Sequence, residues 1–233
     1  MDYSQLTIIT PTFNEADNVP ELIDFISKQF SSASLIVADD GSTDGTQEVI
    51  TQANLANPKF QLLDRSQADV HGLTISVMDA IAMVETDYFV VIDADLQHPP
   101  EVIKNLYTDL LGGNQIVSGA RIPYQENQGW HRIFVTRSAT FLAKLYLRIF
   151  KQIAVSDPMS GFFGGRTEFV QGTIKSSQDR FEPKGYKVFF DLLKASKGSF
   201  DYSETMYQFR FRTSGESKLA PRHAWYFLRS LLR

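Results

Sequence analysis

The stretch Tyr88-Phe-Val-Val-Ile-Asp-Ala-Asp-Leu-Gln97 decides how the rest of this chain is arranged. Its first five residues are aromatic or β-branched, which predicts a buried strand. Two carboxylates, Asp93 and Asp95, follow the strand, and Gln97 lies two residues further on. Alternate residues of an extended chain point to the same side, so the pattern predicts that these three side chains face one point in space.

Oxygen-bearing side chains at the end of a strand suit a hard cation. Carboxylate and amide oxygens are ligands for Mg²⁺ or Mn²⁺, and such a cation commonly carries substrate phosphates. Open α/β sheets bind their ligands at the edge formed by the carboxyl ends of their strands. Because Asp-x-Asp is a short motif, the alternative is a polar loop that holds no ligand.

The remainder of the N-terminal half predicts an alternation of strands and helices. Apolar runs predict strands at residues 6–10, 35–38, 60–63 and 115–118, and apolar residues at helical spacing lie between them. This order predicts an α/β fold with a mostly parallel central sheet and helices on both faces. Pro11 is expected to end the first strand, because proline has no N–H to donate to a neighbouring strand.

Three of the predicted strands end in polar loops, at residues 11–15, 39–44 and 93–97. The carboxyl ends of parallel strands meet at one edge of a sheet, so these loops are expected to converge. Their convergence favours a nucleotide held with a bridging metal ion. The chain has neither Gly-x-Gly-x-x-Gly after the first strand nor Gly-x-x-x-x-Gly-Lys-Ser/Thr, which excludes the usual dinucleotide and P-loop sites.

Charge divides the chain into two unlike halves. The 233 residues carry a net charge of −4, but residues 1–120 sum to −14 and residues 121–233 to +10. The split suggests two different tasks, although the two charges could also face each other across one fold. The absence of cysteine excludes disulfides and thiolate metal sites.

Three segments resemble the family 2 glycosyltransferases, which have the GT-A (nucleotide-diphospho-sugar transferase) fold. They are Ile9-Thr-Pro-Thr-Phe-Asn-Glu15, Val37-Ala-Asp-Asp-Gly-Ser-Thr-Asp-Gly45 and Asp93-Ala-Asp-Leu-Gln-His-Pro-Pro100. Within that family, three later segments resemble the dolichol-phosphate (polyprenyl-phosphate) mannose synthase subgroup: Ser160-Gly-Phe-Phe163, Gly185-Tyr-Lys187 and Gly215-Glu-Ser-Lys-Leu219. The resemblance implies a GT-A catalytic domain over residues 1–219, followed by an amphipathic C-terminal tail over residues 220–233.

The resemblance also implies an activity, which is the inverting transfer of mannose from GDP-mannose to a dolichyl or undecaprenyl phosphate with Mg²⁺ or Mn²⁺. A lipid phosphate is already anionic, since the second pKa of a phosphate monoester is about 6. It can therefore attack the sugar without a general base. The acidic half of the chain would hold the metal ion and the nucleotide, and the basic half would gather phosphates.

Site residues carried over from the family fall into groups. The nucleotide pocket would be lined by Pro11, Phe13, Glu15, Val37 and Asp39. The sugar diphosphate would contact Asp93, Ala94 and Asp95, Arg212 and Lys218 would close on the donor phosphates, and the metal ion would contact Asp95 and Gln97. Further implied binding residues are Lys187 and Arg121, and Arg121 would position the acceptor phosphate. The implied catalytic residues are Asp93, Asp95, Arg121, Arg132 and Asp157, with Arg132 near the acceptor phosphate and Asp157 near the sugar.

Several of these residues also have simpler explanations. Asp39 could serve only to satisfy backbone groups of its turn. Arg132 could belong to a solvated helix face. His71 and His98 are expected to be structural or solvent-facing rather than ligands.

The segment Val70-His-Gly-Leu-Thr74 departs from the family pattern, in which a lysine precedes Gly-Leu-Gly. One alternative is therefore UDP-glucose or another nucleotide sugar as the donor to undecaprenyl phosphate. Another is a regulator that binds a nucleotide sugar without turnover. A polysaccharide-extending transferase is disfavoured, because it needs a general base and the Gln-x-x-Arg-Trp motif is absent.

A lipid acceptor implies contact with a membrane surface. Residues 133–150 form an apolar stripe with interspersed basic residues, and the tail mixes aromatic residues, leucines and arginines. Both are candidates for interfacial helices, although residues 133–150 could instead pack on the sheet. The expected protein is cytoplasmic and peripheral on the cytoplasmic face of a membrane, with or without a separate membrane subunit. Nucleic acid is not an expected partner.

Overall fold

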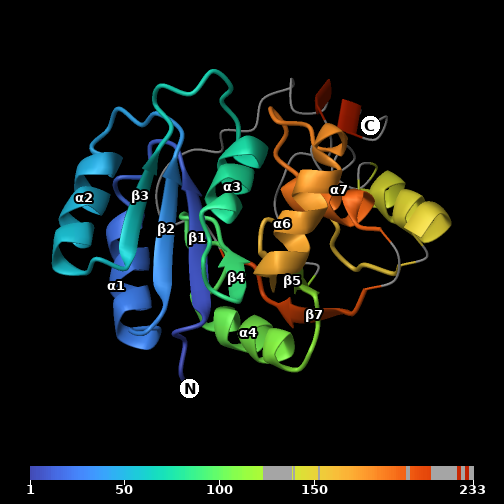
Figure 1. The fold of residues 1–233 in the computed structure, drawn as a ribbon, viewed down its shortest axis with the longest axis horizontal. Coiled ribbons are helices and arrows are strands. Elements are labelled where there is room, and N and C mark those ends of the chain that lie inside the picture. The colour runs from blue at the N-terminus through green and yellow to red at the C-terminus, as the bar shows by residue number, and fades with distance from the viewer. Residues whose placement is uncertain are drawn as a thin grey trace.

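The computed structural model describes residues 1–122, 138, 140–151, 153–197, 200–210, 225–226 and 229–230. Its described strands form one central sheet in the order β3-β2-β1-β4-β6-β5-β7 (Figure 1). The strands are β1 (Leu6–Thr12), β2 (Ser34–Asp39), β3 (Phe60–Asp64), β4 (Tyr88–Val91), β5 (Ile116–Arg121), β6 (Phe163–Arg166) and β7 (Tyr202–Tyr207). The five strands expected from the sequence correspond to β1 through β5.

Four of the six strand pairs in the described sheet are parallel, which confirms the predicted, mostly parallel fold class. β1 pairs with β2 and β4, β2 with β3, and β5 with β7, each in parallel register. The exception is β6, which lies antiparallel between β4 and β5. The start of β6 therefore lies at the same edge of the sheet as the ends of its neighbours.

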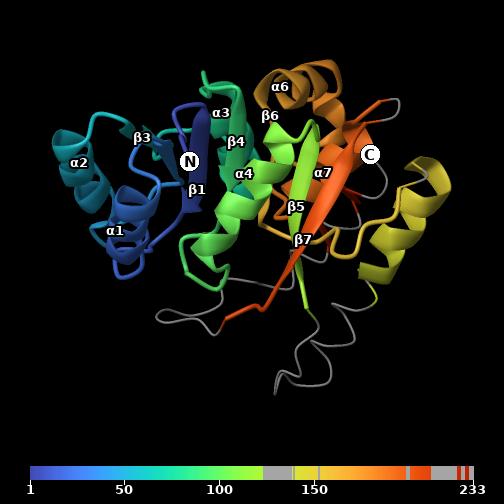
Figure 2. The ribbon, with the colours of Figure 1, turned by 90° about the horizontal axis from the view of Figure 1, so that it is seen from below.

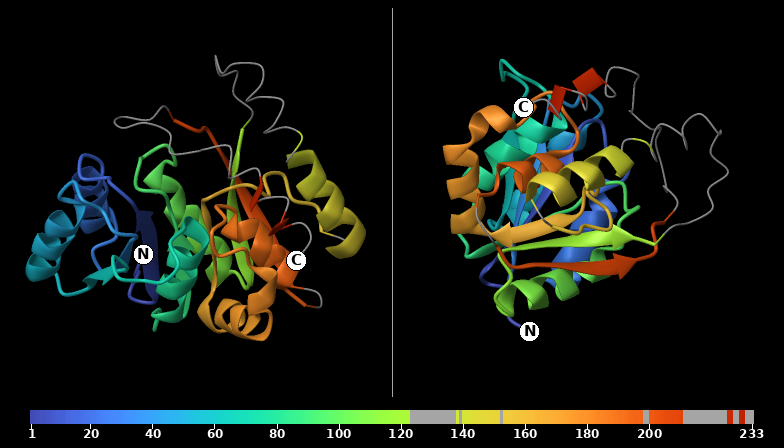
Figure 3. Two further views of the ribbon diagram at one scale, coloured as in Figure 1. Left: turned by 90° about the horizontal axis from the view of Figure 1, so that it is seen from above. Right: turned by 90° about the vertical axis from the view of Figure 1, so that its right-hand side faces the viewer.

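Helices cover both faces of the sheet, as predicted. One core cluster joins the sheet to α1 (Val19–Gln29), α2 (Thr46–Ala56) and α4 (Ile103–Leu111). The other joins it to α3 (Leu73–Ala82), α6 (Thr167–Ser176) and α7 (Val188–Ala195). Short turns of helix complete the described elements: η1 (Pro100–Val102), η2 (Leu147–Lys151) and η3 (Gln178–Arg180). Figure 3 shows helices above and below the strands.

A further helical segment, residues 140–151, lies on the same face as α7 and ends in η2. Ala143 and Leu147 are fully buried against the core, and the Tyr146 ring lies 5.9 Å from that of Phe190. This segment stands at one end of the molecule, beyond α7 (Figure 1).

The prediction that the first strand ends before Pro11 is wrong. β1 continues to Thr12, with Pro11 opposite Ala38 and Thr12 opposite Asp39. Pairing between β1 and β4 ends at Ile9, whose carbonyl accepts a hydrogen bond from the N–H of Ile92. Because alternate residues of a strand face the same neighbour, Pro11 faces this unpaired side, where its missing N–H removes no ladder bond.

The sequence did not predict β6 or β7. β6 reads Phe-Gly-Gly-Arg, which carries little strand propensity, and β7 pairs with a strand more than 80 residues earlier. Figure 2 shows β5 and β7 side by side. Both strands depend on contacts between distant parts of the chain rather than on local pattern.

The glycines of β6 permit a close approach of this strand to its surroundings. A Cβ at Gly164 would lie 2.5 Å from the carbonyl oxygen of Phe89 and 2.9 Å from Cγ2 of Val90. A Cβ at Gly165 would lie 2.7 Å from Cγ2 of Val170 in α6. The glycine at position 165 is therefore required by the packing of α6 on the sheet.

Gly164→Ala should lower the free energy of unfolding by about 1–3 kcal/mol, because the methyl group would overlap a backbone carbonyl that cannot move away. Gly172→Ala is the matched control. Gly172 is exposed within α6 and has nothing within 4 Å of its Cβ position, so alanine there should stabilise by about 0.5–1 kcal/mol. Urea unfolding of both variants measures the difference, and equal midpoints would contradict this account.

Candidate functional site

The loops that follow β1 and β2 are joined by hydrogen bonds at the carboxyl edge of the sheet. The N–H of Asn14 donates to Oγ of Ser42 at 2.7 Å, and the N–H of Thr43 donates to Oδ1 of Asn14 at 2.9 Å. The N–H of Glu15 donates to Oγ1 of Thr46 at 3.0 Å. The expected convergence of these two loops is therefore present.

Asp39 is the organising residue of the second loop. It is fully buried, and its carboxylate accepts hydrogen bonds from the Thr12 hydroxyl at 2.8 Å, the Ser42 N–H at 2.8 Å and the Gln47 amide at 2.8 Å. The N–H of Gly41 and the hydroxyl of Ser42 also donate to it. With both oxygens engaged, Asp39 shapes the loop around which a nucleotide would bind.

Asp40 ties the next part of the chain to the same edge. Its carboxylate pairs with the guanidinium of Arg65 and accepts a hydrogen bond from the N–H of Gly72 at 2.7 Å. Nδ1 of His71 lies 3.1 Å from the same carboxylate. The segment that departs from the family pattern is thus anchored beside the second loop, with a histidine rather than a lysine next to Asp40.

Arg65 is a site residue that sequence reasoning missed. Its side chain is 4% exposed and also donates to Asp79 at 2.9 Å, Ser76 at 2.8 Å and the carbonyl of Val70 at 2.8 Å. A charged residue directly after a predicted strand was the available indication. Its partners come from separate elements, so the sequence did not identify them.

The prediction that Asp93, Asp95 and Gln97 share one side of an extended chain is wrong in its geometry. β4 ends at Val91, and residues 94–96 form a turn in which Leu96 has a φ of 58°. A positive φ is uncommon for a residue with a side chain, and it interrupts the extended conformation here. The turn brings the backbone N–H of Gln97 to 3.2 Å from Oδ1 of Asp95, so the Asp95 carboxylate lies beside the backbone of Gln97.

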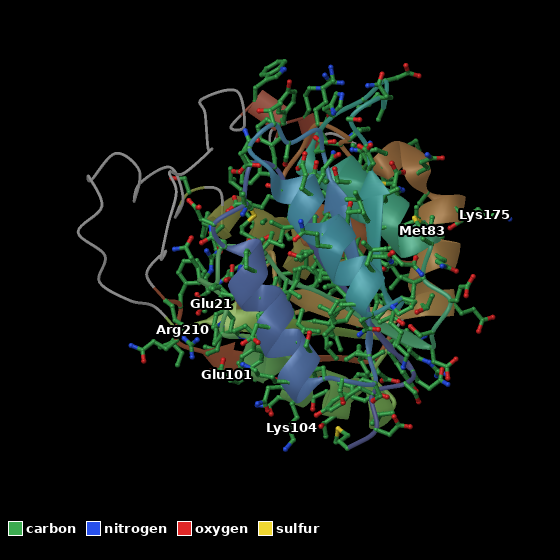
Figure 4. The ribbon with its side chains drawn as sticks, turned by 90° about the vertical axis from the view of Figure 1, so that its left-hand side faces the viewer. Glu21, Met83, Glu101, Lys104, Lys175 and Arg210 are labelled. Atoms are coloured by element: carbon green, nitrogen blue, oxygen red, sulfur yellow. The ribbon has the colours of Figure 1, made fainter. Side chains whose placement is uncertain are left out.

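Gln97 is held from its other side by the segment after β7. Its side-chain NH₂ donates to the backbone carbonyl of Arg210 at 3.2 Å. The backbone carbonyl of Gln97 accepts a hydrogen bond from the backbone N–H of Arg210 at 2.9 Å. The Arg210 guanidinium pairs with Glu101 at 2.8 Å (Figure 4). Because the amide nitrogen is used, the amide oxygen is directed away from Arg210 and is the atom suited to bind a cation.

These donors fit a hard divalent cation. Asp95 and Gln97 supply carboxylate and amide oxygens, which Mg²⁺ and Mn²⁺ prefer. Within the described part of the chain, no group of three or more His, Cys, Asp or Glu residues forms a complete metal site. Mg²⁺ typically binds one or two carboxylates and takes its remaining ligands from water and substrate phosphates, so the small donor set is consistent with such an ion.

Asp93 lies among groups of opposite charge. Oδ2 of Asp93 is 3.2 Å from Nε2 of His98, and a Cβ at Gly161 would lie 2.9 Å from the same oxygen. Burial opposes ionisation of this carboxyl, but the hydrogen bond with His98 and the charges of Lys187 and Arg121 outweigh burial, so the pKa of Asp93 is lowered. Asp93 is therefore a carboxylate at neutral pH.

Arg121 and Asp157, both predicted site residues, form a two-pronged ion pair. Nε of Arg121 lies 2.6 Å from Oδ2 of Asp157, and Nη2 lies 3.1 Å from Oδ1. Arg121 also lies over the ring of Phe209 at 5.4 Å. Asp157 orients the guanidinium, and burial of the carboxyl is outweighed by Arg121, so the pKa of Asp157 is lowered.

Lys187 completes the cationic side of the site. Its Nζ donates to the carbonyl of Met159 at 2.8 Å and lies 4.5 Å from the ring centroid of Tyr186. Burial and the nearby charge of Arg121 lower the pKa of Lys187 to about 8, against the opposing effect of Asp157 and Asp93. Lys187 is thus mainly protonated at pH 7 and poorly solvated, which favours binding of an anion.

The other predicted site residues lie in unlike surroundings. Pro11 and Glu15 are partly exposed near the end of β1, and Phe13 is 47% exposed beside them. Val37 and Ala94 have 0% and 3% exposure and pack in the core, and their contact with a ligand stays a prediction. Arg132, Arg212 and Lys218 lie outside the described residues.

A family model and similar known proteins point to the same family of enzymes. The model of the family described as glycosyl transferase family 2 matches residues 7–173. The dolichol-phosphate mannosyltransferase of Pyrococcus furiosus is 32% identical over 98% of this chain, which spans 63% of that protein. The polyprenol monophosphomannose synthase of Mycolicibacterium smegmatis is 27% identical over 91% of this chain and 80% of its own length.

Solved structures agree on the fold. The glucosyl-3-phosphoglycerate synthase of Mycobacterium tuberculosis, in complex with Mn²⁺, uridine diphosphate and phosphoglyceric acid, superposes with a TM-score of 0.69. It is 22% identical and covers 97% of this chain and 77% of its own. At that identity the likeness concerns the fold alone.

The pKa of Lys187 predicts how binding of a nucleoside diphosphate depends on pH. The protonated amine attracts the diphosphate, so affinity should be highest below the pKa of about 8 and should fall as the pH rises above it. Lys187→Met should weaken binding about tenfold at pH 7, as expected for loss of a charged hydrogen bond, and should remove this pH dependence. Titration calorimetry with Mg²⁺ between pH 7 and 9.5 measures both effects.

Lys175→Met serves as the control for that experiment, because Lys175 is an exposed lysine on α6. It should retain both the affinity and the pH dependence of the parent protein. A Lys187→Met variant that binds as tightly as the parent at pH 7 would contradict the role given to this amine.

Proposed function

Because this chain belongs to glycosyl transferase family 2, we propose that it transfers mannose from GDP-mannose to a polyprenyl phosphate. The observation that carries the proposal is the placement of two opposite charge sets at one edge of the sheet. Asp93 and Asp95 follow β4, and Arg121 and Lys187 face Asp93 from two other elements. A nucleotide sugar with its metal ion fits the acidic set, and phosphates fit the basic set.

The donor would bind along the loops after β1, β2 and β4. Phe13 offers an exposed ring beside the loop that Asp39 holds in place. Asp95 and Gln97 would hold Mg²⁺ or Mn²⁺, which acts as a Lewis acid for the departing nucleoside diphosphate when bound. Lys187 would contact the diphosphate and neutralise part of the charge that develops on it.

The acceptor phosphate would bind near Arg121, whose planar guanidinium Asp157 orients. A phosphate monoester is a dianion above its second pKa of about 6, so it can attack the anomeric carbon without losing a proton to the protein. Attack from the face opposite the nucleoside diphosphate would invert that carbon. A β-linked lipid-phosphate sugar would result from an α-linked donor.

Transfer of labelled sugar into an organic-extractable lipid tests the reaction. Purified protein would receive a polyprenyl phosphate and Mg²⁺ or Mn²⁺, with GDP-mannose and UDP-glucose in separate tubes. The expected result is label from GDP-mannose alone, abolished by a chelator. Asp95→Ala should reduce turnover by at least about a hundredfold, since it removes a ligand of the ion that stabilises the leaving group.

Label from UDP-glucose instead would overturn the donor while retaining the class of reaction. Nucleotide binding without transfer to lipid from either donor would contradict the proposed activity and favour a regulator that only binds nucleotide sugars. Asp64→Ala provides a matched control for the Asp95 variant, because Asp64 is an exposed carboxylate at the end of β3.

The helical segment 140–151 supports contact with a membrane surface. Its exposed large apolar side chains are Phe141, Leu142, Leu145, Ile149 and Phe150, with exposures between 42% and 67%. Lys144 and Arg148 are exposed on the same segment, which has no acidic residue. Apolar side chains beside cations favour a surface of anionic lipid headgroups. In the described part of the chain, no helix is both long and apolar enough to cross a bilayer.

Phe141→Ser combined with Phe150→Ser should weaken binding to vesicles that contain anionic lipid by at least about tenfold, since burial of one phenylalanine contributes about 1.5–3 kcal/mol. Leu55→Ser combined with Leu111→Ser is the control, because these leucines are 81% and 49% exposed on α2 and α4. Co-sedimentation with vesicles measures both, and equal losses would contradict a specific role for residues 140–151.

A further inference from the structure

His98 connects the predicted donor site to the last strand of the sheet. It follows Gln97 directly, yet its side chain is turned inward and the residue is only 3% exposed. Its ring lies 5.4 Å from that of Phe162, 5.6 Å from Tyr207 and 5.2 Å from Phe209. Three aromatic rings from two separate segments therefore fix the plane of the imidazole.

Both nitrogens of the imidazole have polar partners. Nδ1 lies 2.5 Å from the hydroxyl of Tyr207, and Nε2 lies 3.2 Å from Oδ2 of Asp93. Burial raises the pKa of Tyr207, so this phenol remains protonated and can donate to Nδ1. An imidazole that accepts at Nδ1 carries its hydrogen on Nε2, which then donates to the Asp93 carboxylate. One neutral tautomer satisfies the whole chain of contacts.

Two glycines provide the space that the side chains of Tyr207 and Asp93, the partners of His98, occupy. A Cβ at Gly119 would lie 2.8 Å from Cε1 of Tyr207 and 2.9 Å from Cδ1 of Phe162. A Cβ at Gly161 would lie 2.9 Å from Oδ2 of Asp93. Side chains at either position would displace the partners of His98, so the surroundings are shaped for this arrangement.

Asp93 and Lys187 approach the same short segment. Nζ of Lys187 donates to the carbonyl of Met159, two residues before Gly161, whose Cβ position lies 2.9 Å from Oδ2 of Asp93. The charges of Lys187 and Arg121 both act on this carboxylate.

Arg121 is already paired with Asp157, whereas Nζ of Lys187 donates to a neutral group, the carbonyl of Met159. If Asp93 turned toward Lys187, the two charges would neutralise each other in a poorly solvated place, where a close ion pair is strong. The amine would then attract a diphosphate less.

We propose that His98 is a positioning residue that holds the Asp93 carboxylate away from Lys187, and that Tyr207 sets the orientation of its imidazole. The inference rests on the proposed function in one respect, which is that Lys187 receives the diphosphate of the donor. It adds that the last strand of the sheet controls donor binding through a Tyr207–His98–Asp93 chain of hydrogen bonds. His98 acts through Asp93 and does not touch the substrate.

Two substitutions at position 98 separate positioning from packing. Both His98→Gln and His98→Asn remove the aromatic ring and should lower the thermal unfolding temperature by similar amounts. The amide nitrogen of glutamine reaches the place of Nε2 and can still donate to Asp93, whereas that of asparagine reaches only the place of Nδ1. We expect His98→Asn to weaken nucleoside diphosphate binding about tenfold and to raise the donor KM similarly, with His98→Gln within about threefold of the parent protein.

A double-mutant cycle with Asp93→Asn tests the mechanism itself. A neutral amide at position 93 cannot pair with Lys187, so adding His98→Asn to Asp93→Asn should cost less than about twofold in binding. A second tenfold loss in that background would overturn the proposal, as would equal binding by His98→Asn and His98→Gln. If His98→Asn does not fold, Tyr207→Phe decides, because it keeps the ring and should weaken binding about threefold; unchanged binding would then overturn the proposal.

Binding of GDP and UDP with Mg²⁺ is measured without any acceptor, which separates this inference from the proposed reaction. Intact binding and no sugar transfer by the parent protein would contradict the reaction, while the comparison of His98→Asn with His98→Gln would still decide the positioning role. A parent protein that binds neither GDP nor UDP would overturn both.

Discussion

The antiparallel insertion of β6 between β4 and β5 is the constraint on which the site depends. Phe163 at the start of β6 pairs with Val91 at the end of β4 and with Ser118 in β5. Since β6 runs opposite to its neighbours, the chain that leads into it arrives at their carboxyl ends. That segment brings Asp157 to Arg121 and places Gly161 against Asp93. Glycines at 164 and 165 make the insertion possible, because no side chain fits there.

The charges of the site depend on this insertion. Burial would favour the neutral form of both Asp93 and Asp157. The hydrogen bond with His98 and nearby charges outweigh burial at Asp93, and Arg121 outweighs it at Asp157, so the pKa of each carboxyl is lowered. Burial and Arg121 lower the pKa of Lys187 to about 8, and Asp157 and Asp93 act in the opposite direction. The charges balance only when the two carboxylates, Asp93 and Asp157, are counted together with the two cations, Arg121 and Lys187. Phosphates are assigned to this cluster because Arg121 and Lys187 are its two cations and Lys187 is poorly solvated.

Asp39 and Asp93 are carboxylates with different roles at the same edge of the sheet. Asp39 is surrounded by donors from its own loop and from β1, and its task is to hold the loop conformation. Asp93 contacts His98, while its other neighbours are cations. The two residues look alike in sequence, as acidic residues at the ends of strands. The number and origin of their hydrogen-bond donors distinguish them.

The sequence alone determined the first five strands, the helices between them and the shared edge of three polar loops, because these follow from short-range patterns of apolar and turn-forming residues. The family was indicated by the resemblance of six segments to known motifs. Tertiary structure decided the rest. The positive φ of Leu96 departs from the extended conformation expected there. Contacts between distant residues produce β6 and β7, the pairing of Arg65 with Asp40 and the inward position of His98. Local propensity carries no information on such contacts, since a side chain finds its partner only after the sheet has assembled.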